Sequence, residues 1–276
     1  MKVRIKFTKV GALRYVGHLD FMRSFQKIIK RSGVRAVFTK GFSPHMIMSF
    51  ASPLGVGLES LGEYVDFEMA YRDPYELTKI ELQRMSQLGI ENEELPPVPP
   101  EDTIIEMLNS ECPEGVRVLS VKRIEEAKGK AMALVFSSDN VVFLETAWLR
   151  ENNLTDRETL ADLLHKFMEQ ESIVIHKTTK KTESDVDIRP LIFELGLCSD
   201  ADRANSVYAD IEQGGYSLPI FMKLKTGSSA NLKPETVIEA LCAFAEKTYD
   251  PLAIRILRLD LCGEDGRPLS ETGRSF

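Results

Sequence analysis

Three side chains in the first fifty residues are candidates for acid–base chemistry. His18 and Asp20 are two positions apart, and His45 closes a Gly-Phe-Ser-Pro-His turn. Histidine titrates near neutral pH, so His18 or His45 could serve as a general acid or base, or contact a phosphate group. Asp20 would be the nucleophile or base of such a site. The alternative, that each histidine is a hydrogen-bonded structural residue, stays open.

A basic stripe begins next to these residues. The pattern from 18 to 32 predicts a helix that ends at Gly33, with apolar residues along one side. The opposite side carries Arg23, Lys27, Lys30 and Arg31, within about a third of the helix circumference. Lysine and arginine at this spacing bind phosphates with a steep salt dependence. The alternative is a solvated stripe that the rest of the chain neutralises.

The charge distribution points the same way. The 276-residue chain has a formal charge of -7, yet residues 1–50 hold eleven basic residues and one acidic residue, a balance of +10. Such a difference between segments suggests a surface that faces a polyanion. The candidate nucleic-acid contacts are Arg14, Arg23, Lys27, Lys30, Arg31 and Lys40, together with Lys177, Lys180, Lys181 and Arg189 near a predicted hairpin tip. Tyr15, Phe38 and Phe42 could stack on bases or belong to the core.

The elements that would position these residues recur twice. Strands are predicted at 2–7, 34–40, 46–51, 63–71 and 115–124, with helices at 18–32 and 73–85. The second half is predicted to have strands at 131–136, 140–146, 172–177, 185–195, 218–226 and 253–262. Its helices fall at 154–170, capped by Thr155, and at 233–247. The order predicts an α+β protein of two ferredoxin-like (β-α-β-β-α-β) sandwiches with antiparallel sheets, at 1–126 and 127–276.

Composition limits the remaining possibilities. No apolar run approaches the roughly 20 residues that span a bilayer, and no signal peptide is evident, so a cytoplasmic protein without membrane contact is expected. The four cysteines, at 112, 198, 242 and 262, fit no metal-binding spacing. We therefore expect no metal site and no resident cofactor.

Three motifs resemble a bacterial family of unknown function, the radical-SAM-linked proteins. They are Gly-His-Leu-Asp-x-x-Arg from Gly17, Gly-Phe-x-Pro-His from Gly41, and Gly-x-x-Ser-x-x-Glu-Tyr from Gly57. The resemblance implies a protein encoded beside, or fused to, a B12-binding-type radical SAM enzyme, often near genes of ribosomal proteins and RNA processing. The chain lacks the Cys-x-x-x-Cys-x-x-Cys motif, so a partner would perform any radical chemistry.

Three functions remain at this stage. The first is an accessory subunit that binds RNA, ribosomal or transfer RNA, and presents it to a radical SAM partner. The second is an RNA-directed enzyme in its own right, similar to a pseudouridine synthase or an endonuclease, by analogy of fold. The third is a protein–protein adaptor whose basic face docks on an acidic patch without nucleic acid. The sequence does not separate the first from the third.

Overall fold

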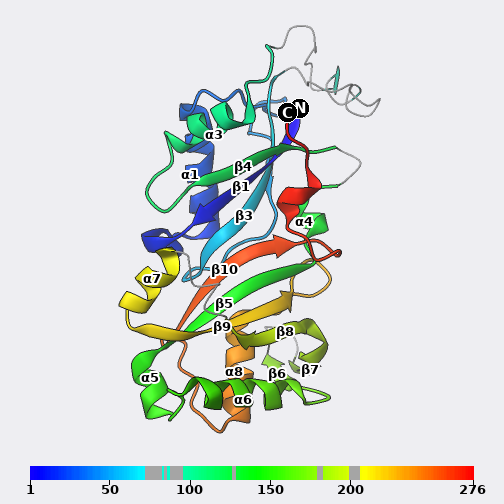
Figure 1. Cartoon of the computed structure of the whole chain (residues 1–276). Helices are drawn as coiled ribbons and strands as arrows, with labels where there is room; N and C mark the ends of the chain where they lie inside the picture. Colours follow the sequence, from blue (N-terminus) through cyan, green and yellow to red (C-terminus); the bar gives the residue numbers. More distant parts are fainter. Residues whose placement is uncertain (72–82, 84–85, 88–95, 126–128, 179–182, 199–205) are drawn as a thin grey trace. The chain divides into compact units, whose positions relative to one another are not determined.

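The computed structural model describes the chain except residues 72–82, 84–85, 88–95, 126–128, 179–182 and 199–205 (Figure 1). The described residues form two compact units. Unit 1 comprises Met1–Val135 and Asp260–Phe276, and unit 2 comprises Phe136–Leu259. The boundary predicted between residues 126 and 127 lies outside the described residues, so the division into those halves stays a prediction.

Unit 1 is built on an antiparallel sheet. Its strands are β1 (Lys2–Lys9), β2 (Met48–Phe50), β3 (Glu59–Glu68) and β4 (Val118–Arg123). Strand β1 pairs with β3 on one side and with β4 on the other, and β2 pairs with β3. Val3 lies opposite Phe67 in one pair and opposite Arg123 in the other. β1 is thus a central strand, which explains why Val3, Ile5 and Phe7 are fully buried.

Helices α1 (His18–Arg31) and α3 (Glu101–Asn109) pack on one face of this sheet. The apolar side of α1 supplies Phe21, Phe25 and Ile28 to a core shared with the inward side chains of β1. Phe7 contacts the ring of Phe25 at 4.8 Å between centroids. The predicted amphipathic helix is confirmed, and its residues 18–31 follow the expected bounds closely. The predicted helix at 73–85 lies almost entirely outside the described residues.

The alternation of charged and apolar residues at 2–7 is typical of a half-buried strand, but the other face of the unit 1 sheet is also covered. Arg4 is 1% exposed and makes a bidentate ion pair with Asp66, at 2.8 and 3.1 Å. The same carboxylate accepts a hydrogen bond from the N–H of Ala131, and Arg4 donates to Thr272. A short helix α4 (Ala131–Leu134) and a 3-10 turn (Leu269–Thr272) cover these groups. Alternation alone could not show this second layer.

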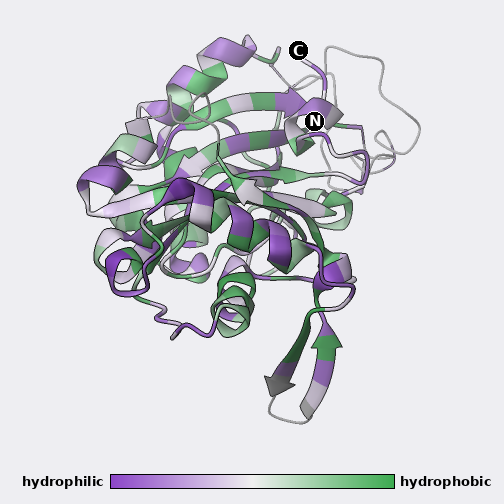
Figure 2. Ribbon diagram, turned by 60° about the horizontal axis from the view of Figure 1, so that its bottom comes forward, coloured by the Kyte–Doolittle hydropathy of each residue, from purple (hydrophilic) through white to green (hydrophobic). Residues whose placement is uncertain are grey.

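Unit 2 contains a second antiparallel arrangement. Strand β9 (Tyr216–Lys225) pairs on one edge with β5 (Ser137–Glu145) and on the other with β8 (Ile192–Leu197). Strands β6 (Val174–Thr178) and β7 (Glu183–Asp187) form a separate hairpin, which is visible in Figure 2. Its helices are α5 (Thr146–Glu151), α6 (Arg157–Met168), α7 (Ser206–Gln213) and α8 (Pro234–Phe244). Strand β10 (Ile254–Cys262) runs through the boundary at Leu259.

Several elements predicted for the second half of the chain are wrong in detail. The strand expected at 131–136 is α4 over its first four residues, and Asp139, in the gap between the strands expected at 131–136 and 140–146, belongs to β5. Asp139 fits in a strand because Lys223, opposite it on β9, lies 3.1 Å from its carboxylate. Asp156, not Thr155, caps α6, since its side chain accepts the N–H of Thr159.

The coarse class is confirmed, because both units combine helices with mostly antiparallel strands. The twofold ferredoxin-like repeat stays a prediction. Across the described residues, no helix is both long enough and apolar enough to cross a bilayer. Three cysteines, at 198, 242 and 262, are buried, and Cys112 is half-buried; burial raises the pKa of the Cys112 thiol to about 11.

Candidate functional site

The outer side of α1 presents its cations to solvent. Arg23, Lys27, Lys30 and Arg31 are all exposed, while the opposite side of the helix is buried. Gly17 begins the helix without a side-chain cap, and Asp20 lies in the first turn, where a carboxylate stabilises the positive end of the helix dipole. The packing that buries the apolar side therefore fixes the direction of the cationic side.

Among the described residues, ion pairs neutralise little of this cationic side. Arg23 forms an ion pair of 3.2 Å with Asp20, but both side chains are 70% exposed, and such pairs contribute little. Among the described residues, no carboxylate lies within 4.0 Å of Lys27, Lys30 or Arg31. In the described part of the molecule, the acidic residues of the rest of the chain therefore do not pair with Lys27, Lys30 or Arg31.

An aromatic turn adjoins the C-terminal end of the helix. The Lys30 ammonium lies 5.7 Å from the ring centroid of Phe38, a cation–π contact. Phe38 forms an isolated bridge with Met46, and Thr39 bonds to both the backbone and the ring of His45. These bonds hold the turn that carries Lys40 and the fully exposed Phe42. We call Arg23, Lys27, Lys30, Arg31, Phe38, Lys40 and Phe42 the α1 face.

Other cations of the basic segment have structural partners. Lys6 forms an ion pair of 2.6 Å with Asp260, whose other oxygen accepts the Tyr64 hydroxyl at 2.5 Å. That contact and the burial of the ring raise the pKa of Tyr64 far above its usual value, with burial the larger cause. Arg14 lies 3.8 Å from the buried carboxylate of Glu59 and stacks on Tyr15. The excess of +10 therefore includes several charges that the fold itself uses.

His18 is half-buried in a small cluster whose lining includes none of the α1 face residues. Phe21, Phe50, Lys9 and Glu63 line the same cavity of about 10 Å³, roughly the volume one water needs. Lys9 is 1% exposed, and its ammonium donates to the carbonyl of Val16 at 2.8 Å. Burial lowers the pKa of Lys9, and the charge of Glu63 opposes this shift. The sequence did not reveal Lys9 or Glu63 as neighbours of His18, although the third motif contains Glu63.

The cluster gives a prediction about pH. Burial is the main cause that lowers the pKa of His18, with Lys9 acting in the same direction and Glu63 against it. The unfolded chain takes up a proton near pH 6.5 before the folded chain does. The free energy of unfolding should therefore fall as the pH drops below about 6.5. Urea titrations of the native chain and His18→Gln, between pH 7.5 and 5, test this. The native chain should lose more stability than the variant, whereas equal losses would contradict the shift.

The remaining candidate acid–base residues occupy separate surroundings. Asp20 is exposed and pairs with Arg23, and His45 is exposed in the aromatic turn, where its Nδ1 lies 3.0 Å from Thr39 Oγ1. Neither residue lines the cavity that contains His18. No group of three potential metal ligands occurs in the described ranges.

The predicted basic hairpin of unit 2 is described in part. Lys177 belongs to β6, while Lys180 and Lys181 lie outside the described residues. Arg189 is half-buried, and its guanidinium donates to the carbonyls of Met168 and Ile192, which gives it a structural role. His176 on β6 bonds with Asp185 on β7 at 3.0 Å.

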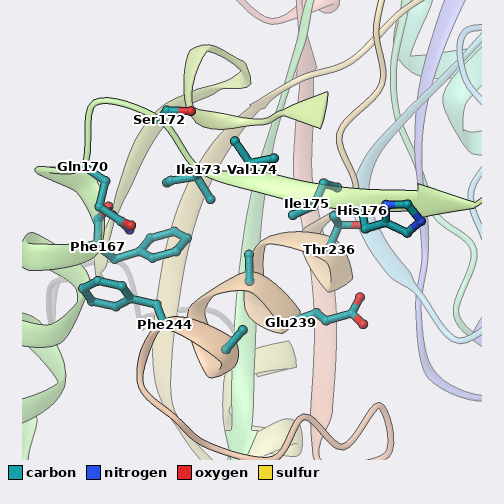
Figure 3. Close-up of a pocket in the computed structure, with 12 residues that line it drawn as sticks. Phe167, Gln170, Ser172, Ile173, Val174, Ile175, His176, Thr236, Glu239 and Phe244 are labelled. Carbon is teal, nitrogen blue, oxygen red and sulfur yellow. Dashed lines mark hydrogen bonds between the residues drawn. The ribbon is translucent and has the colours of Figure 1, made fainter. Parts of the chain in front are cut away.

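A groove of about 390 Å³ lies in unit 2 between β6 and α8 (Figure 3). Phe167 and Phe244 meet at one end, with ring centroids 5.7 Å apart, and His176, Thr236 and Glu239 lie at the other. No local pattern predicts this groove, because its walls come from two segments, 167–176 and 236–244, that are far apart in the sequence.

The fold and the α1 face define an α+β protein with an exposed cationic helix. The chain belongs to a family described as an uncharacterized protein conserved in bacteria (DUF2344), whose model matches residues 2–103 and 89–234. No curated protein matches the chain.

Proposed function

We propose that this chain is an RNA-binding accessory subunit that presents RNA to a radical SAM partner enzyme. The proposal of RNA binding rests on one observation. Lys27, Lys30 and Arg31 of the α1 face are exposed, and among the described residues no carboxylate lies within 4.0 Å of them. Such cations bind phosphates and release counterions. The partner is proposed from the motifs at Gly17, Gly41 and Gly57 that resemble radical-SAM-linked proteins.

The aromatic turn favours single-stranded or looped RNA over duplex. Phe42 is fully exposed and Phe38 is 38% exposed, next to Lys40 and Lys30. Exposed rings next to cations are the combination that stacks on unpaired bases while it holds the backbone. An adaptor that docks on an acidic protein would use the same cations, with the exposed phenylalanine in a pocket of that protein and not stacked on bases.

The strand arrangement of unit 1 restricts where RNA could bind. In the described residues, the strands and longer helices follow the order β1-α1-β2-β3-α3-β4, and the antiparallel neighbours are β4 beside β1, β1 beside β3 and β3 beside β2, as in a ferredoxin-like sandwich. We propose this fold for unit 1. In several RNA-binding modules of this kind, RNA lies on the open face of the sheet. Here α4 and the 3-10 turn cover that face, so we place the RNA on the helix side.

A salt titration tests the proposal. The purified chain should bind a stem-loop RNA, with the logarithm of the association constant falling linearly against the logarithm of salt concentration. Four phosphate contacts give a slope of about −3 to −4, since each contributes about 0.7 to 0.9. The measurement is fluorescence polarisation between 50 and 400 mM KCl. A slope near zero, or no binding at the lowest salt, would contradict RNA binding.

A second function has a specific observation in its favour. His18 shares a cavity with Lys9 and Glu63, and clusters of titratable groups with shifted pKa values often mark catalytic sites. Incubation of the pure chain with total RNA, followed by nucleoside analysis and gel electrophoresis, tests an RNA-directed enzyme. If the chain cleaves or modifies RNA and His18→Ala abolishes this activity, the chain acts as an enzyme and not as an accessory subunit.

A further inference from the structure

The groove of unit 2 is hollow because small residues line one side of helix α8. Thr236, Glu239, Ala240 and Ala243 follow the spacing i, i+3, i+4 and i+7, which places them on one face of the helix. Two of the four are alanine, so the space above them stays open. Ala243 is exposed and Ala240 is half-buried. The volume of about 390 Å³ is sufficient for a bound side chain or a small ligand.

Strand β6 borders this groove with its edge. Five consecutive residues, 172 to 176, line the groove, three of them in β6, although successive side chains of a strand point to opposite faces. Because residues from both faces of the strand line the groove, the groove follows the edge of the strand. No residue of β7 lines it, so the edge is the one that faces away from β7.

That edge presents backbone groups for a further strand. The N–H of Ile188 donates to the carbonyl of Ile173 at 2.8 Å, and the register of β6 and β7 is regular. Hydrogen-bonded pairs alternate in an antiparallel ladder, so the N–H and C=O of Val174 point away from β7. Val174 is 60% exposed, and within the described residues β6 pairs with β7 alone. Exposed strand edges of this kind bind extended peptides.

The chemistry of the two ends restricts the occupant. Phe167 and Phe244 offer an apolar surface, and Phe244 is 40% exposed. At the other end Glu239 is exposed, and no basic side chain among the described residues lies within 4.0 Å of it. This end therefore complements a cation. Side chains at positions i and i+2 of an extended segment point the same way, so one segment can meet both ends.

We propose that an extended segment of a partner protein binds this groove as an added strand on β6. An apolar side chain of that segment packs against Phe167 and Phe244, and a lysine or arginine two residues away pairs with Glu239. Backbone hydrogen bonds to Val174 set the register. This inference concerns unit 2 and is independent of RNA binding by the α1 face.

Phage display of random linear peptides on the full-length chain provides the probe. Enriched peptides should share an apolar residue two positions from lysine or arginine. The tightest is then synthesised with a fluorophore, and its affinity is measured by polarisation. Enrichment without this pattern, or no enrichment, would overturn the proposal.

Substitutions with matched controls locate the peptide. Ala243→Phe fills the groove and should weaken binding at least about tenfold, whereas Ala161→Phe, at an exposed alanine of α6, should leave it unchanged. Val174→Pro removes one edge donor and should cost about threefold to tenfold, while Val174→Thr keeps the donor and the affinity. Glu239→Lys should shift the selected peptides from basic to acidic.

Two outcomes would assign the groove differently. Peptides that bind Ala243→Phe as tightly as the native chain would show that they dock elsewhere. A concentration-dependent dimer in sedimentation, dispersed by Ala243→Phe, would show that a second copy of this chain occupies the groove. Either result overturns the assignment to a partner segment.

Discussion

The double variant Lys27→Glu, Arg31→Glu should bind a stem-loop RNA about one to two orders of magnitude more weakly than the native chain at 100 mM salt. Both side chains are exposed on the α1 face, and neither has a carboxylate within 4.0 Å in the described part of the chain. Arg23 is a poorer choice, because Asp20 already pairs with it. Reversal removes two phosphate contacts and adds repulsion, so the salt slope should also become shallower by about two.

A control with the same change of net charge separates local contact from general repulsion. Lys166→Glu and Lys233→Glu alter two exposed lysines of unit 2, one on α6 and one before α8. This variant should keep an affinity within about threefold of the native value, because neither lysine belongs to the α1 face and both exposed charges are screened by salt. Equal losses in the two double variants would show that net charge, and not the α1 face, governs binding.

Asp66→Ala should lower the free energy of unfolding by about 3 to 5 kcal/mol. The substitution leaves the guanidinium of Arg4 buried at 1% exposure without its bidentate partner, and also removes the acceptor of the Ala131 N–H. The cost arises from the uncompensated charge and from the loss of hydrogen bonds that hold α4 to the sheet. Urea denaturation followed by circular dichroism gives the value.

The exposed pair of Asp162 and Lys166 on α6 is the comparison. Its side chains are 60% exposed for Lys166 and 62% for Asp162, so Asp162→Ala should change the free energy of unfolding far less than Asp66→Ala does. In the double variant Arg4→Met, Asp66→Leu, apolar packing replaces the pair and should recover much of the loss. A cost below about 1 kcal/mol for Asp66→Ala would contradict a structural role for the buried pair.

Local pattern predicted those parts of the fold that depend on local physics. The bounds of α1 follow from its apolar spacing and from Gly33, and the alternation at 2–7 and 253–262 indicates β1 and β10. The predictions fail where a residue far away in the sequence determines the local structure. Asp139–Asn140 has the composition of a turn, but Lys223 on β9 stabilises the aspartate within a strand. The sequence pattern does not predict helix α3, because the helix begins after Pro100 in a segment whose prolines are typical of a loop.

The exposed cations of the candidate site could be predicted from the sequence, whereas its buried charged residues could not. The cations of α1 share one side of a helix, so their exposure follows from amphipathicity. Arg4 and Lys9 look equivalent to them in sequence, yet both are buried by tertiary packing that no local pattern encodes. The helix α4 and the 3-10 turn cover Arg4, whereas Lys9 lies on the α1 side, in the cavity that contains His18 and Phe21. The lysine and glutamate beside His18 come from β1 and β3, and only the pairing of these strands brings them together.

Photo-crosslinking tests the central claim most directly, because it reports the residues that touch RNA. The purified chain is bound to a stem-loop RNA at low salt, irradiated, digested and analysed by mass spectrometry. Crosslinks should concentrate in peptides from residues 20–45, with Phe38 and Phe42 as prominent sites. Crosslinks confined to unit 2, or a yield that does not exceed that of the Lys27→Glu, Arg31→Glu variant, would show that the α1 face does not bind RNA.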